Sequence, residues 1–218
     1  MTRVVTHPSG LIWYPDHGYG RLSALDKPNA EVYDGAYFEK YVGYARTVLG
    51  ERLNAARVNL VEKYAPGYVV VDLGIGCGDF VEGRNRALNL REMNPTTLGF
   101  DVNPAGVKWL RERGFYFDPY QQRPPCLTCW DSLEHLEFPD ELIRRVEHFL
   151  FVSIPIFRDR DHVLRSKHFR TDEHFWYFSQ DGFLSWMHAN GFICLEQNRM
   201  ETELGREDIG TFVFRRER

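Results

Sequence analysis

The stretch VVVDLGIGCGDF, residues 69–80, joins a continuous run of aliphatic residues to three alternating glycines. A strand that is buried on both faces has such a run rather than an alternating pattern. Gly74, Gly76 and Gly78 follow it, and their missing Cβ atoms let the chain turn tightly and let a ligand approach the backbone. A helix that begins there offers unpaired N–H groups. The stretch therefore predicts a strand–loop–helix unit that holds a ligand, unless the glycines serve only the turn.

Strand and helix patterns alternate along the rest of the chain. Strands are expected over residues 68–73, 97–102, 115–117, 126–130, 149–154, 192–197 and 211–215. Helical patterns lie between most of them, from the glycines to about residue 91 and over residues 104–113, 139–147 and 180–190. This alternation predicts an α/β fold, namely a Rossmann-like, doubly wound, mostly parallel seven-stranded sheet with an antiparallel last strand. Ligands of such sheets bind at the carboxyl ends of the strands.

The N-terminal part of the chain has a different pattern. Residues 1–30 are rich in Gly, Pro, Tyr and His and are expected to be irregular. Apolar residues at helical spacing over residues 33–64 predict two helical segments that separate near Gly50. We therefore divide the chain into an N-terminal part, residues 1–66, and one globular α/β domain, residues 67–218. Two connections in that domain stand out, an aromatic, His-rich one over residues 155–179 and a charged, exposed hairpin over residues 201–210.

Two aspartates indicate which ligand the glycine loop holds. The spacing is G-x-G-x-G, whereas a nicotinamide dinucleotide site has G-x-G-x-x-G. Asp72, at the end of the preceding strand, would repel a pyrophosphate but suits an ammonium or sulfonium group. Asp101 ends the next strand, where a carboxylate can accept hydrogen bonds from both hydroxyls of a ribose. Together the two acids favour S-adenosylmethionine over NAD.

Three segments, VVVDLGIGCGDF, LGFDVNP and LTCWDSLEHL, resemble successive motifs of class I S-adenosylmethionine-dependent methyltransferases, in their small DxGxGxG…EHL branch. The resemblance covers residues 68–154, and the helix and strands over 180–215 follow in the expected order. It implies S-adenosylmethionine as cofactor and an N-terminal helical lid whose Tyr33, Tyr37 or Tyr41 contacts the cofactor. One departure is Pro124-Pro125, which stands where the family has an acidic residue before the fourth strand.

Carried over by position, the resemblance assigns further residues to the cofactor. Asp72 and the three glycines would line the methionine end and the ribose, and Asp101 would hold the ribose hydroxyls. The adenine would lie beside Val102, Asn103, Phe117 and Asp118, and the sulfonium above Trp130 and Asp131.

Methyl transfer is an in-line displacement that depends mainly on positioning. It needs a base only if the acceptor atom carries a proton. His135, His168 and His174 are the candidate bases, although each of them could instead cap a helix or pack as a structural polar group. No metal is expected: His168, Asp172, Glu173 and His174 are suitable ligand types, but H-E-x-x-H is absent.

Other motifs carry less information. The pair of Cys126 and Cys129 has no partner at zinc-site spacing and predicts buried small side chains. Pro125-Cys126 and Asp118-Pro119-Tyr120 resemble motifs of nucleic-acid methyltransferases, but both lie at the wrong positions relative to the strands. These nucleic-acid signatures are therefore coincidental.

Composition narrows the class of acceptor and the cellular compartment. The net charge is −4 and the isoelectric point about 6.1, which disfavours general nucleic-acid binding without excluding it. Four cysteines and no membrane-length apolar run indicate a cytoplasmic protein that uses no membrane. We expect a metal-independent methyltransferase for a small-molecule or single-group acceptor. A nucleic-acid methyltransferase, a nicotinamide-dependent oxidoreductase and a non-catalytic cofactor-binding interaction protein stay open as alternatives. The sequence leaves the acceptor and the oligomeric state undetermined.

Overall fold

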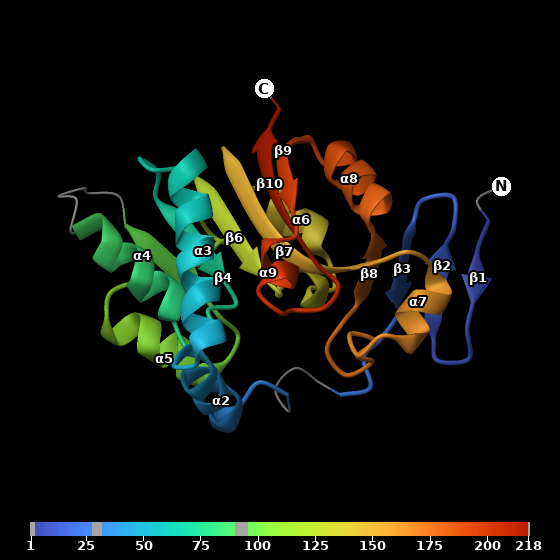
Figure 1. Cartoon of the computed structure of the whole chain (residues 1–218), viewed down its shortest axis with the longest axis horizontal. Coiled ribbons are helices and arrows are strands. Elements are labelled where there is room, and N and C mark those ends of the chain that lie inside the picture. The colour runs from blue at the N-terminus through green and yellow to red at the C-terminus, as the bar shows by residue number, and fades with distance from the viewer. Residues whose placement is uncertain (1–2, 28–31, 90–95, 218) are drawn as a thin grey trace.

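Parallel strands surround the glycine loop. In the computed structural model, which describes residues 3–27, 32–89 and 96–217, β4 (Val70–Leu73) lies between β5 (Thr97–Phe100) and β6 (Cys126–Trp130). Both pairings are parallel, and β6 pairs in parallel with β7 (Phe149–Phe157). All five residues of β6 are buried, as expected of a central parallel strand. The predicted parallel centre of the sheet is confirmed (Figure 1).

The last strand reverses direction. β10 (Ile209–Arg216) is antiparallel to both of its neighbours, β7 and β9 (Phe192–Asn198). This confirms the antiparallel last strand. The expected strand over residues 115–117 is reduced to a single parallel bridge between Tyr116 and Gly99 at the edge of the sheet.

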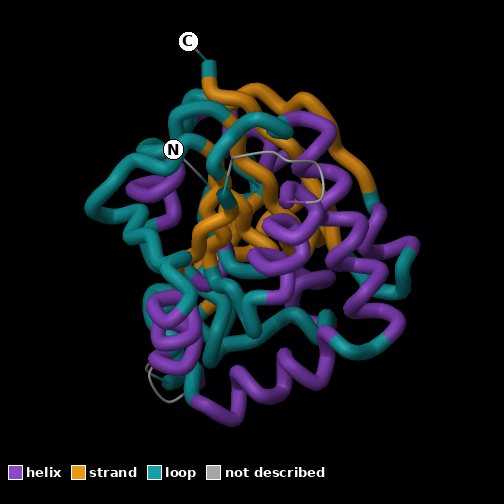
Figure 2. The backbone as a smooth tube through the Cα atoms, turned by 90° about the vertical axis from the view of Figure 1, so that its left-hand side faces the viewer, coloured by secondary structure: helices purple, strands orange, loops and turns teal. Residues whose placement is uncertain are grey.

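Helices cover both faces of the sheet, which confirms the doubly wound arrangement. Along each strand, neighbouring residues point to opposite faces: Val70 packs in a cluster with α3 (Val48–Tyr64), whereas Val71 packs in a second cluster with α6 (Pro139–Ile143) and α8 (Gln180–Ala189). α4 (Asp79–Asn89) and α5 (Pro104–Glu112) pack beside β5. In the turned view of Figure 2 the strands occupy the upper middle of the molecule, and helices lie to the right of them and below them.

The N-terminal residues contain strands, so the expectation of irregular structure over residues 1–30 is wrong. β1 (Val5–Thr6), β2 (Leu11–Tyr14) and β3 (Tyr19–Leu22) form an antiparallel extension of the sheet at one end of the molecule (Figure 1). β2 alternates buried and half-buried residues, with Leu11 and Trp13 in a core cluster. Gly20 of β3 pairs with Trp13 of β2, and a glycine is needed there because a Cβ would lie 2.7 Å from the ring of Trp13.

The long connection after β7 is also more ordered than expected. It contains α7 (Arg160–Arg165) and β8 (Trp176–Ser179). β8 pairs with β3 on one side and with the end of β7 on the other, so it joins the N-terminal strands to the central sheet. The described sheet therefore has ten strands rather than seven. The division of the chain at residues 66 and 67 stays a prediction.

Helix boundaries differ from the expectation in two places. α2 (Gly35–Ala45) ends before Thr47, whose side chain caps α3 by accepting a hydrogen bond from the N–H of Gly50 at 3.1 Å. Gly50 thus lies inside α3 and not between the helices. A Cβ there would lie 2.3 Å from the carbonyl oxygen of Tyr44, so Gly50 permits α2 and α3 to meet closely. α6 ends at Ile143, and the expected helix end near residue 91 lies outside the described residues.

Candidate functional site

The glycine loop adopts a backbone that favours glycine. Gly74, Gly76 and Gly78 have φ angles of 73°, 58° and 84°, in the left-handed region that other residues rarely occupy. A Cβ on Gly78 would lie 2.5 Å from the ring of Trp109, and one on Gly74 would lie 2.9 Å from Cβ of Ser132. The glycines therefore permit both the tight turn and the close packing around it.

Two acidic residues lie at the strand ends beside this loop. Asp72 in β4 is 2% exposed and accepts a hydrogen bond from Oγ1 of Thr128 at 2.6 Å. Burial raises the pKa of Asp72 to about 7, and Thr128 and the distant Arg57 oppose that rise. Asp101, which directly follows β5, accepts a hydrogen bond from the N–H of Asn103 at 2.8 Å. Both carboxylates thus lie at the carboxyl ends of adjacent parallel strands.

Burial also raises the pKa of Asp101, and backbone N–H groups oppose the rise. These groups belong to Val102 and Asn103, which follow Asp101, and to Ile75 and Gly76 of the glycine loop. The carboxylate of Asp101 therefore faces the glycine loop.

Two adjoining cavities open at this edge of the sheet. The histidine cavity, named for His135, His168 and His174 in its wall, has a volume of about 620 Å³. The Asp101 cavity has a volume of about 120 Å³ and lies beside Asp101, Val102 and Asn103. The cavities share the lining residues Tyr37, Tyr41, Gly74, Gly76, Trp130, Asp131 and His135.

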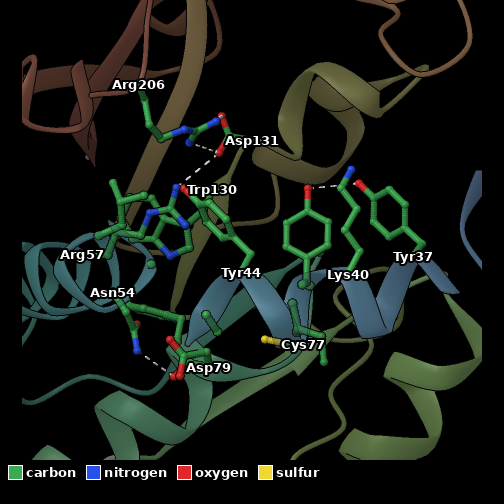
Figure 3. A pocket seen from close by; sticks show the side chains of 18 of the residues that line it. Tyr37, Lys40, Tyr44, Asn54, Arg57, Cys77, Asp79, Trp130, Asp131 and Arg206 are labelled. Atoms are coloured by element: carbon green, nitrogen blue, oxygen red, sulfur yellow. Dashed lines mark hydrogen bonds and ion pairs between the residues drawn. The ribbon is translucent and has the colours of Figure 1, made fainter. Parts of the chain in front are cut away.

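Helix α2 covers the glycine loop as a lid. The ring of Tyr41 lies against Gly76, where a Cβ would be 3.3 Å away. The hydroxyl of Tyr37, which is labelled in Figure 3, lies 3.3 Å from that of Tyr41, and both tyrosines line the two cavities. Asn103 attaches the lid to the sheet, because its Nδ2 donates a hydrogen bond to the carbonyl of Asp34 at 2.8 Å. Its Oδ1 caps α5 through the N–H of Ala105.

A network of partly buried ion pairs forms another wall of the histidine cavity. Asp131, which directly follows β6, pairs with Arg57 of α3 at 3.2 Å and with Arg206 through Nη2 at 3.0 Å (Figure 3). Both guanidinium groups also pair with Glu201 of α9 (Met200–Glu203). Glu201 is fully buried and accepts a further hydrogen bond from Ser153 at 2.7 Å. The expected exposed hairpin over residues 201–210 is therefore wrong in part: Glu201 and Arg206 point inward to this network, whereas Glu203 and Glu207 are exposed.

The network sets the charge states of its members. Burial alone would raise the pKa of Asp131, but the charges of Arg206 and Arg57 outweigh it and hold that pKa below its usual range. Burial lowers the pKa of Arg206, and Asp131 and Glu201 more than compensate, so its net shift is upward. Asp131 and Arg206 are thus both held in their charged forms.

Two histidines and a glutamate meet on the other wall. Glu134 and His135 lie in a short helical turn, η1 (Leu133–His135), after β6. A backbone hydrogen bond of 2.9 Å from the N–H of Phe175 to the carbonyl of Glu134 aligns this turn with the segment before β8. His174 is thereby placed with its ring centroid 4.6 Å from that of His135. His135 Nδ1 lies 2.7 Å from the hydroxyl of Tyr33, near the lid.

Burial dominates the protonation of this group. It lowers the pKa of His135 to about 4 and lowers the pKa of His174 well below its usual value. Burial likewise raises the pKa of Glu134 well above its usual value, and Asp131 adds to the rise. His168 lies apart from the pair, half-buried, with Nε2 donating to the carbonyl of Glu207 at 3.0 Å. The two buried histidines are accordingly neutral at pH 7.

Comparison with known proteins identifies the family. A family model described as a methyltransferase domain matches residues 41–197, well over half of the chain. The chain belongs to this methyltransferase family. The match confirms the resemblance to class I S-adenosylmethionine-dependent methyltransferases and, with it, S-adenosylmethionine as the predicted cofactor. No curated protein matches the chain in sequence.

Solved structures share the fold of this methyltransferase at low sequence identity. Magnesium protoporphyrin IX methyltransferase from Synechocystis PCC 6803 with bound SAH has a TM-score of 0.55 at 14% identity, over 87% of this chain and 98% of that one. An S-adenosylmethionine-dependent methyltransferase from Clostridium acetobutylicum ATCC 824 has a TM-score of 0.54 at 11% identity, over 84% of this chain and 98% of that one. The (4+2) cyclase SpnF has a TM-score of 0.53 at 16% sequence identity, over 79% of this chain and 84% of that one. The likeness shows the fold, and the cyclase indicates that the fold alone does not set the reaction.

Most of the residues that the sequence assigned to the methyltransferase site come together around the two cavities. Those that line one or both cavities are Tyr37, Asp72, Gly74, Gly76, Asp101, Val102, Asn103, Trp130, Asp131, His135, His168 and His174. Gly78, Phe117 and Asp118 line neither. Phe117 packs against the hydrophobic core, and Asp118 accepts a hydrogen bond from the N–H of Tyr120 at 2.9 Å.

Several residues of the candidate site carry no recognisable sequence signal. Tyr120 lines the Asp101 cavity in place of the predicted Asp118. Arg57 and Arg206 line the histidine cavity but lie far from the motifs in sequence. Glu134 belongs to the EHL motif, yet the motif does not reveal that its carboxylate is buried. Cys126 and Cys129 are free and buried, as expected, and burial raises the pKa of Cys126 to about 12.

The described part of the methyltransferase holds no helix that is both long and apolar enough to cross a membrane.

Proposed function

We propose that this protein transfers the methyl group of S-adenosylmethionine to a small-molecule acceptor held in the histidine cavity. One observation carries the proposal. That cavity extends without a break from the glycine loop and Asp72, beneath the lid, to the three histidines. A methyl donor on the loop would therefore share one continuous cavity with an acceptor and with side chains that can take up a proton.

The proposed donor site uses the acids at the strand ends. Asp101 would accept hydrogen bonds from the ribose hydroxyls, and Asp72 would face the positively charged methionine end. The electron-rich rings of Tyr37 and Tyr41 would attract the sulfonium through a cation–π interaction. Both rings already make a contact of this kind, with Lys40 Nζ 5.5 Å and 5.8 Å from their centroids.

The proposed reaction is a direct displacement. A lone pair of the acceptor attacks the methyl carbon as the bond from that carbon to sulfur breaks, and S-adenosylhomocysteine leaves as a neutral thioether. Holding the two reactants about 3 Å apart in line supplies much of the rate. If the acceptor is a hydroxyl, its proton passes to a histidine, for which His135, His168 and His174 are the candidates. The displacement itself needs no metal ion, and metal independence of the whole reaction stays a prediction.

The charges of the cavity support a small acceptor. Its cationic lining residues are Lys40, Arg57, Arg170 and Arg206, and its carboxylates are Asp72, Asp79, Asp131, Glu134 and Glu173. Three of the four cations are paired with carboxylates, so little positive charge is available for a polyanion. A nucleic-acid acceptor is therefore disfavoured. The family assignment likewise gives no support to a nicotinamide cofactor.

Calorimetry and isotope transfer test this function. S-adenosylhomocysteine should bind with one site per chain, whereas NADH should not bind. S-adenosylmethionine carrying a tritiated methyl group should label the small-molecule fraction of a cell extract. Label in the nucleic-acid or protein fraction would overturn the small acceptor. Cofactor binding with no transfer to any fraction would leave a cofactor-binding interaction protein.

Asp72 should make cofactor binding depend on pH around neutrality. Its pKa is raised to about 7 in the free protein, so the carboxyl is protonated at pH 6 and ionised at pH 8. Affinity for S-adenosylmethionine should therefore rise between these values, with release of a proton on binding near pH 7. Calorimetry in buffers of different ionisation enthalpy measures both effects.

The matched variant is Asp72→Asn, which keeps the shape and loses the charge. Because the folded pKa lies above the unfolded value of 3.8, ionisation of Asp72 destabilises the fold as the pH rises from 4 through 7. The variant should bind the cofactor more weakly without the pH dependence, and at pH 8 it should unfold at a higher temperature than the natural protein. If cofactor affinity depended on pH equally in both proteins, ionisation of Asp72 would not be the cause of that dependence.

A further inference from the structure

Glu134 is the least satisfied ionisable side chain around the cavities among the described residues. It is 1% exposed, and neither Oε1 nor Oε2 has a hydrogen-bond partner. Burying a carboxylate without a partner is costly. Glu134 is nevertheless one of the residues that line the histidine cavity.

Two imidazoles complete the surroundings of this carboxylate. Nε2 of His135 lies 4.0 Å from Oε1 of Glu134. His174 is 4% exposed, and its Nδ1 is buried without a hydrogen-bond partner. One ligand atom from each of the three residues can be chosen so that all three lie within 4.8 Å of one another. Three donor atoms at such distances leave room for an ion between them after small side-chain movements.

We propose that Glu134, His135 and His174 bind one divalent transition-metal ion, such as Zn²⁺, Mn²⁺ or Fe²⁺. Two imidazoles and one carboxylate form a mixed nitrogen and oxygen donor set that suits these ions. Mg²⁺ and Ca²⁺ prefer ligands that are all oxygen. The ion would supply the partner that the carboxylate of Glu134 lacks.

The surroundings of the three ligands fit this role. With Nε2 of His135 on the ion, its Nδ1 keeps the hydrogen and donates it to the hydroxyl of Tyr33, 2.7 Å away. Such second partners orient metal-bound histidines and raise metal affinity. Arg170 is paired with Glu173 at 2.6 Å and is thus partly neutralised. Because Tyr33 precedes α2, the lid would be attached to the metal ligands.

The site also narrows the class of acceptor, a step that rests on the proposed function. Three protein ligands leave a coordination position open, and all three line the histidine cavity. An oxygen of the acceptor, such as that of a phenol, an enol or a hydroxy acid, would occupy this position and be held toward the methyl group. His135 and His174 would then serve as ligands, and His168 would remain the candidate base. This departs from the metal-independent reaction predicted from the sequence.

Metal titration of the full-length, chelator-treated protein tests the site. Co²⁺ should bind with one ion per chain and give the visible absorption of a four- or five-coordinate site, and Zn²⁺ should displace it. Glu134→Gln and His174→Gln should each weaken Zn²⁺ binding at least 10-fold, and Tyr33→Phe about 10-fold, as loss of an outer-shell partner does. His188→Gln, which changes an exposed histidine, should leave binding unchanged.

Thermal unfolding separates a lost site from a lost fold. Metal-free Glu134→Gln should unfold at the same temperature as the metal-free natural protein or higher, because it removes an unpaired buried carboxyl. Zn²⁺ should raise the unfolding temperature of the natural protein but not of this variant. Equal Zn²⁺ affinity in the natural protein and all three variants, or no binding at all, overturns the site. S-adenosylhomocysteine should bind to the metal-free protein in either case, so failure of the metal site leaves the donor site intact.

Discussion

Replacing Asp101 by alanine is expected to weaken the binding of S-adenosylhomocysteine by about 100-fold. In the proposed complex the carboxylate accepts two hydrogen bonds from the ribose, and hydrogen bonds to charged groups contribute about 1.5–3 kcal/mol each. A loss of about 3 kcal/mol corresponds to about two powers of ten in the dissociation constant. Isothermal titration calorimetry of the purified chain measures the change directly.

Asp118→Ala is the matched control for this variant. The sequence assigned Asp118 to the adenine, but the structure directs its carboxylate to the N–H of Tyr120 and places it outside both cavities. We therefore expect a change in affinity of no more than a few-fold. If Asp118→Ala caused the large loss and Asp101→Ala the small one, the ribose assignment would be wrong and the adenine assignment from the sequence would stand.

Replacing Glu201 by alanine should lower the free energy of unfolding by about 3–5 kcal/mol. Removing one partner of a buried ion pair leaves the other charge without compensation, which costs about this much. Here two guanidinium groups, those of Arg57 and Arg206, lose a fully buried partner. For a chain of this size the midpoint of thermal unfolding should fall by roughly 6–20 °C. Circular dichroism or calorimetry follows the transition.

Lys108→Ala provides a control for the loss of any ion pair. Lys108 pairs with Glu112 at 3.8 Å, and the side chains are 75% and 58% exposed. Exposed pairs of this kind contribute little, so the transition should not move measurably. An unchanged midpoint in Glu201→Ala would mean that Asp131 alone neutralises both guanidinium groups. The two variants together therefore measure what burial adds to an ion pair.

The parts of the fold and site that the sequence predicted are those set by local patterns. The buried strand before the glycines, the proline and Gly114 that bound α5, and the alternation of strand and helix all act within a few residues. Asp72 and Asp101 were recognised because parallel strands bring their carboxyl ends to one edge. Strands β1–β3 were missed, since each is four residues or shorter and Gly20 and its neighbours hide the alternation.

The sequence by itself determined the glycine-loop side of the candidate site, because one strand, one turn and the end of the next strand form it. Only the tertiary structure decided the acceptor side. Arg57 reaches Glu201 across 144 residues, and the pairing of Phe175 with Glu134 brings His174 to His135. No local pattern encodes such contacts, since they depend on how distant segments pack. The same packing leaves the carboxylate of Glu134 buried without a partner, which a motif of residue types cannot express.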